Sequence, residues 1–283
     1  MLNRKKTKKA VKLTAVLLSL VFALVALSGP ALAANKLSGE LLMSGSTTVQ
    51  PLAEELKAAF TKKNPDVKIN IAGGGSGVGI KDVADGKVHI GNSSRQLKPA
   101  DPSGLVANVI GYDAVAIIVN PKCPAPAVVK KGLSKQQAQD IFTGKINNWK
   151  DVGGKDAPII VNSRTAPSGT LDFFSEEVLD KGAVVDTAKK HESTGLLKQA
   201  VAQNKNAIGF ISLGYLDKKV KGVNYNGVAP TLKNAVAGKY PLVRPLVMVT
   251  KGKPAGLAAE FIKFAKSAAG QKIVATKWLK AKK

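Results

Sequence analysis

Residues 67–85, VKINIAGGGSGVGIKDVAD, decide the fold of this chain. Val67, Ile69 and Ile71 alternate with polar residues, which predicts a β-strand with one buried face. The strand ends in the glycine-rich turn of residues 73–79, and a helical pattern follows that turn. A strand that enters a helix through a tight turn is the repeating unit of an α/β fold.

Strand and helix patterns alternate in the same way along the rest of the chain, which predicts an α/β fold with largely parallel sheets. A long apolar strand over residues 112–120 runs into a proline-rich segment, and the chain returns through residues 240–245. We therefore expect two lobes, with hinge crossings near residues 113–121 and 229–243. The predicted limits are 34–115 and 244–283 for the first lobe and 116–243 for the second.

The first 33 residues have the three-part layout of a signal peptide. Six basic residues occupy the start, an apolar run covers residues 13–27, and Ala31-Leu32-Ala33 forms a small-residue cleavage site. The apolar run is shorter than the roughly 20 residues that a membrane-spanning helix needs, so we favour cleavage over a retained anchor. Because no cysteine lies near residue 33, we expect a periplasmic protein that is not a lipoprotein.

The chain is strongly basic, with 43 Lys and Arg against 19 Asp and Glu. Without the six basic residues of the predicted signal peptide, 37 remain against 19, a net charge of +18. Such a charge fits nucleic acid, an anionic surface or an anionic solute as the partner. The lysines are dispersed and aromatic residues make up only 5% of the chain, which argues against a stacking platform for single strands.

Four predicted strands end in turns rich in Gly, Ser and Thr, and at least three of these turns lead into helices. They cover residues 44–48, 73–79, 92–95 and 162–170. Ligands of open parallel sheets bind at the carboxyl ends of the strands, and the free N–H groups of a helix start favour anions. Because no acidic residue lies inside these turns, they predict a site for a small oxyanion.

Two of these turns also contain an arginine. Arg164 precedes the turn of residues 168–170 and offers a forked guanidinium, which matches two oxygens of a tetrahedral anion. Arg95 has two possible roles, which are contact with the ligand and support of the Ser93-Ser94 turn from outside.

With these motifs in this order, the chain resembles the substrate-binding proteins of high-affinity bacterial phosphate ABC transporters, over essentially its whole length after the signal peptide. The motifs that carry the resemblance are Gly45-Ser46-Thr47-Thr48-Val49-x-Pro51, the loop of residues 73–79, Ile90-Gly91-Asn92-Ser93-Ser94-Arg95, Ile141-Phe142-x-Gly144-x-Ile146-x-Asn148-Trp149, Arg164 with Ser168-Gly169-Thr170, Asn206-Ala207-Ile208-Gly209-Phe210, Tyr240-Pro241-Leu242-x-Arg244-Pro245-Leu246 and Gly270-Gln271-Lys272-Ile273-Val274. The resemblance implies the type II periplasmic-binding-protein fold, in which two α/β lobes joined by hinge strands close over one dehydrated phosphate. It also implies that a monomer delivers inorganic phosphate to the membrane permease subunits of the transporter.

The resemblance implies phosphate ligands on turns of both lobes. They are Ser46, Thr47, Thr48, Ser76, Ser94 and Arg95 in the first lobe and Arg164, Ser168, Gly169 and Thr170 in the second. It implies that Phe142 and Trp149 are packing residues.

The chain departs from some members of the family at Ser94, where they carry an aspartate. In those proteins the aspartate accepts the proton of bound phosphate and repels sulfate, which has no proton to offer. The serine therefore leaves the source of phosphate-over-sulfate selectivity open, and sulfate or molybdate is the alternative ligand.

Two other classes of function fit the sequence less well. A secreted phosphatase would need metal ligands or a nucleophile with a base, but His89 and His191 belong to no HExxH motif or Cys/His cluster, and we expect neither to be a ligand. A basic adhesin or a nucleic-acid-binding module would rest on the positive charge alone. We therefore expect a binding protein rather than an enzyme, with no cofactor, no metal and no nucleic-acid partner.

Overall fold

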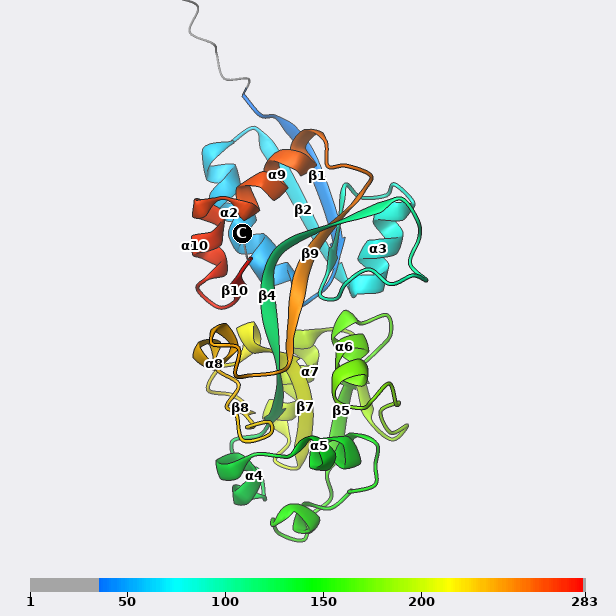
Figure 1. Cartoon of the computed structure of the whole chain (residues 1–283), viewed down its shortest axis with the longest axis vertical. Helices are drawn as coiled ribbons and strands as arrows, with labels where there is room; N and C mark the ends of the chain where they lie inside the picture. The colour runs from blue at the N-terminus through cyan, green and yellow to red at the C-terminus, as the bar shows by residue number, and fades with distance from the viewer. Residues whose placement is uncertain (1–35, 282–283) are drawn as a thin grey trace, which may run out of the picture. The chain divides into compact units, whose positions relative to one another are not determined.

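The computed structural model describes residues 36–281, in which strands and helices alternate (Figure 1). The strands are β1 (Gly39–Gly45), β2 (Val67–Gly74), β3 (Ile90–Ser93), β4 (Leu105–Val119), β5 (Ile160–Arg164), β6 (Lys189–His191), β7 (Ala207–Ser212), β8 (Lys221–Gly222), β9 (Val243–Lys251) and β10 (Leu279–Lys280). The α-helices are α2 (Gln50–Lys63), α3 (Ser76–Ala84), α4 (Pro126–Lys131), α5 (Lys135–Phe142), α6 (Gly169–Glu177), α7 (Thr194–Gln203), α8 (Leu232–Val236), α9 (Gly256–Lys266) and α10 (Ala268–Val274). The predicted signal peptide, residues 1–33, lies outside the described residues. Within residues 36–281, no helix combines the length and the apolar character needed to span a bilayer.

The strands follow one continuous order, β2-β1-β3-β9-β4-β7-β5-β6, with β8 and β10 paired to β4. Strand β4 is shared: residues 105–114 pair with β9, and residues 115–119 pair with β7. The first part of β4 and β9 thus belong with β1, β2 and β3 in a first lobe, and β5, β6 and β7 form the sheet of a second lobe (Figure 1). Strands β4 and β9 run side by side where the chain passes between the lobes (Figure 1). This is the predicted α/β fold of two lobes joined by hinge strands.

The prediction of largely parallel sheets is only half correct. Pairings among β1, β2 and β3 and among β5, β6 and β7 are parallel. By contrast, β9 is antiparallel to β3 and β4, and β4 is antiparallel to β7. Strands β4 and β9 are antiparallel to each other because the chain leaves the first lobe along β4 and returns to it along β9.

Most element positions follow the sequence patterns. Helix α5 begins with a capping box, in which Ser134 Oγ accepts from Gln137 N and the Gln137 side chain accepts from Ser134 N. Helix α2 ends at Lys63, and its C-cap residue Asn64 precedes Pro65, which disfavours a helical conformation at Asn64. Phe142 and Trp149 are fully buried, which agrees with the packing role that the resemblance implied.

Two element predictions are wrong in extent. Strand β4 begins at Leu105 rather than Tyr112, because its exposed first residues still pair with β9. Strand β5 continues through Arg164, which was expected to lie in a turn, because β6 pairs alongside it.

Each lobe has its own aromatic packing. In the second lobe, Phe174 stacks on Phe210 with ring centroids 4.0 Å apart, and Phe142 meets both rings edge-on. In the first lobe, Phe60 of α2 packs against Phe261 of α9 at 5.3 Å. Phe174 belongs to α6 and Phe60 to α2, so these contacts pack each of the two helices within its own lobe.

Candidate functional site

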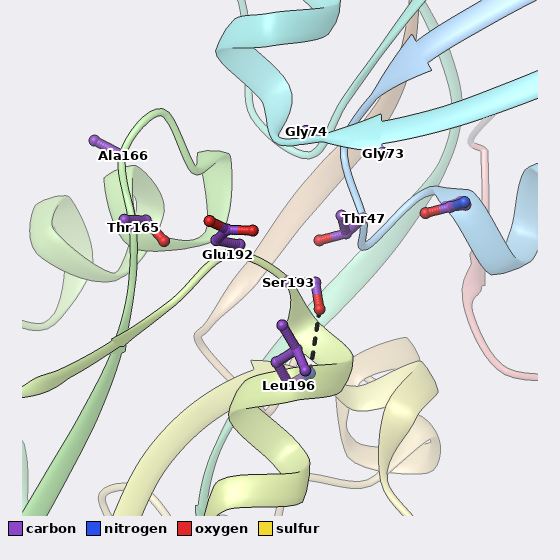
Figure 2. Close-up of a pocket in the computed structure, with 9 residues that line it drawn as sticks. Thr47, Gly73, Gly74, Thr165, Ala166, Glu192, Ser193 and Leu196 are labelled. Atoms are coloured by element: carbon purple, nitrogen blue, oxygen red, sulfur yellow. Dashed lines mark hydrogen bonds between the residues drawn. The ribbon is translucent and has the colours of Figure 1, made fainter.

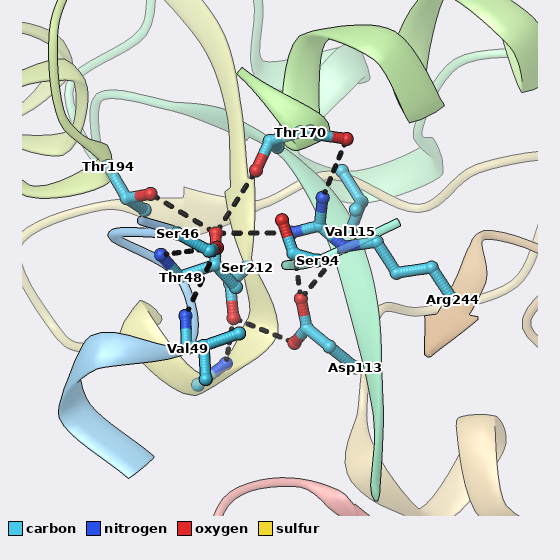
Figure 3. Close-up of polar contacts among 12 residues, drawn as sticks. Ser46, Thr48, Val49, Ser94, Asp113, Val115, Thr170, Thr194, Ser212 and Arg244 are labelled. Atoms are coloured by element: carbon cyan, nitrogen blue, oxygen red, sulfur yellow. Dashed lines mark hydrogen bonds and ion pairs between the residues drawn. The ribbon is translucent and has the colours of Figure 1, made fainter. Parts of the chain in front are cut away.

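Polar side chains at the starts of three helices meet between the lobes (Figure 3). Thr48, just before α2, places its hydroxyl oxygen 3.1 Å from that of Thr170 in α6 and 3.4 Å from that of Thr194 in α7. Thr47 Oγ1 also lies 3.4 Å from Thr194 Oγ1. All four threonines are buried. The helix starts therefore bring unpaired N–H groups and partial positive charge to one buried place.

A fourth helix, α3, begins beside them with Ser76. Its hydroxyl oxygen accepts from the backbone N of Ser94 at 3.1 Å and lies 3.3 Å from Ser94 Oγ. A side chain in place of Gly169 would collide with the Ser76 hydroxyl, so the start of α6 and the start of α3 are packed against each other. The predicted residues Ser46, Thr47, Thr48, Ser76, Ser94, Ser168, Gly169 and Thr170 are all buried in this region.

The close approach of the lobes depends on glycine at one further position. Gly75 has a φ of +99°, and a Cβ atom there would run into the Pro167 carbonyl oxygen of the second lobe. Gly77 N donates to that same oxygen at 3.3 Å. A larger residue at position 75 would be strained in itself and would hold the two lobes apart.

Arg164 points its guanidinium at the start of α7. Its Nε donates to His191 O at 3.1 Å, its Nη2 to Glu192 O at 2.8 Å and its Nη1 to Thr194 Oγ1 at 3.0 Å. Burial lowers the pKa of Arg164 to about 10, and the nearby positive charge of Arg244 contributes to this shift. These partners are neutral oxygens, so a buried positive charge faces the helix starts without a carboxylate among the contacts just named.

A second arginine, Arg244, lies in the same buried region and was not predicted as a site residue. It forms an ion pair with Asp113 at 3.0 Å, and both side chains are almost completely buried. Its guanidinium also donates to Thr48 Oγ1 and to Gly169 O, each at 3.3 Å (Figure 3). Burial raises the pKa of Asp113, and the adjacent Arg244 charge opposes that shift.

Arg95 lies at the edge of the cleft, where it contacts carboxylates of both lobes. Its two terminal nitrogens donate to Asp101 at 2.7 and 2.9 Å, and this contact lowers the pKa of Asp101. Its Nε forms an ion pair with Asp172 of α6 at 2.9 Å, without the geometry of a hydrogen bond. The Arg95 backbone N and O both bond to Ser93 Oγ. The Arg95 side chain thus contacts carboxylates of both lobes, whereas its backbone bonds to the Ser93-Ser94 turn.

A pocket of about 480 Å³ opens next to the threonine cluster (Figure 2). Its lining comes from both lobes and consists of Thr47, Gln50, Gly73, Gly74, Thr165, Ala166, Glu192, Ser193 and Leu196. Thr47 belongs both to this pocket and to the buried cluster. The lobes are thus in contact around the helix starts, and the pocket lies between them next to this contact.

The histidines lie outside the cluster of hydroxyl groups. His89 Nδ1 accepts from Leu42 N at 2.9 Å, and His191 Nε2 lies 2.9 Å from Asn162 Oδ1. Within residues 36–281, no three His, Cys, Asp or Glu side chains are grouped so that they could hold a metal ion.

Comparison with known proteins places the chain in a family. Residues 30–269 match a family model described as the PBP superfamily domain. The phosphate-binding protein PstS of Bacillus subtilis (strain 168) is 37% identical over 246 residues, which cover 86% of this chain and 80% of the relative. This chain belongs to the PstS-type phosphate-binding proteins. As members of this family are substrate-binding proteins, the chain is not an enzyme.

Solved structures of PstS-type proteins have the same fold. A phosphate ABC transporter substrate-binding protein of Clostridium perfringens, with bound phosphate, matches with a TM-score of 0.81 at 39% identity, covering 86% of this chain and all of the other. An ABC-type phosphate transport receptor of Vibrio cholerae matches with a TM-score of 0.69 at 30% identity, over 86% of this chain and 100% of the other. The type II periplasmic-binding-protein fold implied by the sequence is therefore confirmed.

Sequence reasoning missed three residues of the cluster as site residues: Thr194, Asp113 and Arg244. Thr194 follows Ser193, whose hydroxyl accepts from Leu196 N, and a helix-start pattern over residues 192–195 was visible in the sequence. Arg244 had a signal too, because an arginine inside an apolar strand must find a buried partner. Which carboxylate it would meet depends on strand register, which no local pattern gives.

Proposed function

We propose that this protein binds inorganic phosphate in the cleft between its lobes and delivers it to an ABC importer. One observation carries the proposal: the starts of α2, α3, α6 and α7 meet around buried hydroxyl groups, with Arg164 beside them. Helix starts and a guanidinium are donors with positive charge, which is the chemistry that a small oxyanion requires. The phosphate bound to the C. perfringens relative supports phosphate as that anion.

The proposed ligands come from both lobes, so that binding and closure occur together. They are Ser46, Thr47, Thr48, Ser76 and Ser94 from the first lobe and Arg164, Ser168, Gly169 and Thr170 from the second. Arg95 is assigned to the support of the Ser93-Ser94 turn, because its nitrogens already contact Asp101 and Asp172. The lobes are proposed to comprise residues 34–115 with 244–283, and residues 116–243.

Phosphate and sulfate differ in that bound phosphate carries a proton, so selectivity between them depends on how the site contacts that proton. Ser94 and Ser76 lie 3.3 Å apart, and a hydroxyl can either donate or accept. A protonated phosphate oxygen can therefore be accommodated at Ser94, but sulfate is not repelled there as it would be by a carboxylate. We expect phosphate to be preferred by a smaller margin than in relatives that carry the aspartate.

The setting is proposed from the family and the N-terminal sequence. Residues 1–33 act as a cleavable signal peptide, and the mature chain works as a monomer outside the cytoplasmic membrane. Its protein partners are the permease subunits of a phosphate ABC transporter, and it binds no nucleic acid and no cofactor.

The test is a calorimetric titration of the mature chain, residues 34–283, with phosphate, arsenate, sulfate and molybdate at two salt concentrations. Saturable one-to-one binding of phosphate and arsenate that survives high salt supports the proposal. Sulfate or molybdate binding tighter than phosphate would assign another oxyanion. No heat with any of the four anions would overturn the proposed function.

A further inference from the structure

The ion pair of Asp113 and Arg244 lies on the two hinge strands. Asp113 of β4 and Arg244 of β9 face each other directly in the antiparallel ladder. Arg244 Nη2 and Nε lie 3.0 and 3.2 Å from Asp113 Oδ2, and Ser212 Oγ donates to Asp113 Oδ1 at 2.7 Å. A fully buried ion pair contributes little to stability, because the desolvation of both charges offsets their attraction. Its presence at the hinge suggests another role.

The guanidinium reaches the proposed ligand turns of both lobes at once. Nη2 donates to Thr48 Oγ1 of the first lobe and Nη1 donates to Gly169 O of the second, each at 3.3 Å (Figure 3). The Phe173 ring, with its centroid 5.7 Å from Arg244 Cζ, limits the positions open to the guanidinium. One side chain thus links the hinge to both walls of the cleft.

The direction of these hydrogen bonds matters for an anion. A guanidinium only donates, so Thr48 Oγ1 accepts from Arg244 and its own proton is directed elsewhere. The bond to Gly169 O fixes the peptide plane whose N–H belongs to Thr170, one of the free amides at the start of α6. Both contacts orient a donor that the oxyanion site can use.

We propose that Arg244, held by Asp113, is a positioning residue of the phosphate site that couples hinge closure to the orientation of Thr48 and of the α6 start. This inference rests on the proposed function of phosphate binding. Arg244 acts through Thr48 and Gly169, whereas Arg164 is the proposed ligand.

The alternative is that the ion pair only stabilises the hinge. A double-mutant cycle separates the two roles, because residues that act through one another have non-additive effects on binding. The hinge change is Asp113→Asn with Arg244→Gln, which leaves no unpaired buried charge. It is combined with Thr48→Val, which removes the hydroxyl while keeping the shape. Calorimetry gives the phosphate Kd of each variant, and circular dichroism and thermal melting of the ligand-free protein check the fold.

We expect the hinge change to raise the phosphate Kd about 30-fold or more, since two charge-assisted hydrogen bonds are lost. We then compare the variant that combines the hinge change with Thr48→Val. Its fold-increase in Kd should be at least about fivefold smaller than the product of the fold-increases caused by the hinge change alone and by Thr48→Val alone. The control cycle combines the hinge change with Ser76→Ala. Here the fold-increase in Kd of the combined variant should equal the product of the two separate fold-increases. An unchanged Kd for the hinge variant, or effects that multiply with Thr48→Val, would overturn the proposal.

Arg244→Lys covers the case in which the hinge variant does not fold. A lysine keeps the charge beside Asp113 but has no fork to reach Thr48 and Gly169 together. We expect it to fold and to bind phosphate about tenfold more weakly or worse, and wild-type affinity would contradict the proposal. Absence of phosphate binding by the unmodified protein would instead contradict the proposed function itself.

Discussion

Thr48 of the first lobe and Thr170 of the second place their hydroxyl oxygens 3.1 Å apart, so the two walls of the cleft touch through the side chains proposed to bind phosphate. Thr194 and Arg164 continue this contact into the second lobe. Ligand affinity in such a site depends both on the donors and on the contacts that keep the lobes together.

Arg164→Ala should lower phosphate affinity by at least about 100-fold, because it removes the forked cation of the site and its charge-assisted hydrogen bonds. It also removes the Arg164 Nη2 donor from the Glu192 carbonyl, whereas the His191 carbonyl keeps its bond from Thr165 N, so the melting temperature of the ligand-free protein should fall. Calorimetry and thermal melting measure the two effects. Lys131→Ala, the loss of one exposed positive charge, is the matched control and should bind as the unmodified protein does. Retained affinity in Arg164→Ala would show that the second-lobe ligands are wrongly assigned.

Ser94→Asp should increase the preference for phosphate over sulfate by about tenfold or more. A carboxylate beside Ser76 would accept the proton of phosphate and repel sulfate, which has none. The matched control is Ser94→Asn, which has a similar shape without the charge and should bring no such gain. Competition between the two anions in a calorimetric titration measures the ratio. An equal ratio in Ser94→Asp and Ser94→Asn would argue against this position as the selectivity determinant.

Lys98→Met should weaken phosphate binding by about two- to fivefold at low salt. Lys98 of the first lobe pairs with Glu176 of α6 at 2.7 Å and with Asp172 at 3.7 Å, contacts that join the lobes across the cleft edge. Its matched control is Lys135→Met, which removes the same charge from a pair with Asp180 inside the second lobe. The difference between the two variants should vanish at high salt, because exposed pairs are screened. Equal affinities at low salt would show that the edge contacts do not hold the lobes closed.

His191 should make the ligand-free protein less stable in mild acid. Burial, with the positive charges of Arg164 and Lys189, lowers the pKa of His191 in the folded state. The unfolded chain, with a histidine pKa of about 6.5, binds a proton that the folded state disfavours, so stability falls as the pH drops below that value. Between about pH 7 and about pH 5, the melting temperature of His191→Gln should therefore fall by less than that of the unmodified protein. The same loss in both proteins would rule out His191 as the cause.

Local features of the sequence predicted much of this fold. The capping box of α5, the end of α2 before Pro65 and the alternating residues of β2 each depend on a few neighbouring residues. Candidate ligands on the turns could be named for the same reason, because a strand, a small-residue turn and a helix start follow one another in the chain.

The rest depends on contacts between distant residues. Strand β5 extends to Arg164 because β6 lies beside it, and Arg244 meets Asp113 through the register of β4 and β9. Arg95 shows the same limit, since its ion pair with Asp172 joins segments 77 positions apart in the sequence. The charged residues can be read from the sequence, but which of them form ion pairs with one another depends on the fold.

A crystal structure of the mature protein grown with arsenate is the most direct test of phosphate capture between the lobes. Arsenate has the shape and charge of phosphate, and the anomalous signal of arsenic locates it without interpretation of weak density. We predict one strong anomalous peak between the lobes, within hydrogen-bonding distance of Thr48, Ser76, Arg164 and Thr170. A peak at another place on the protein, or none in the cleft, would contradict the account.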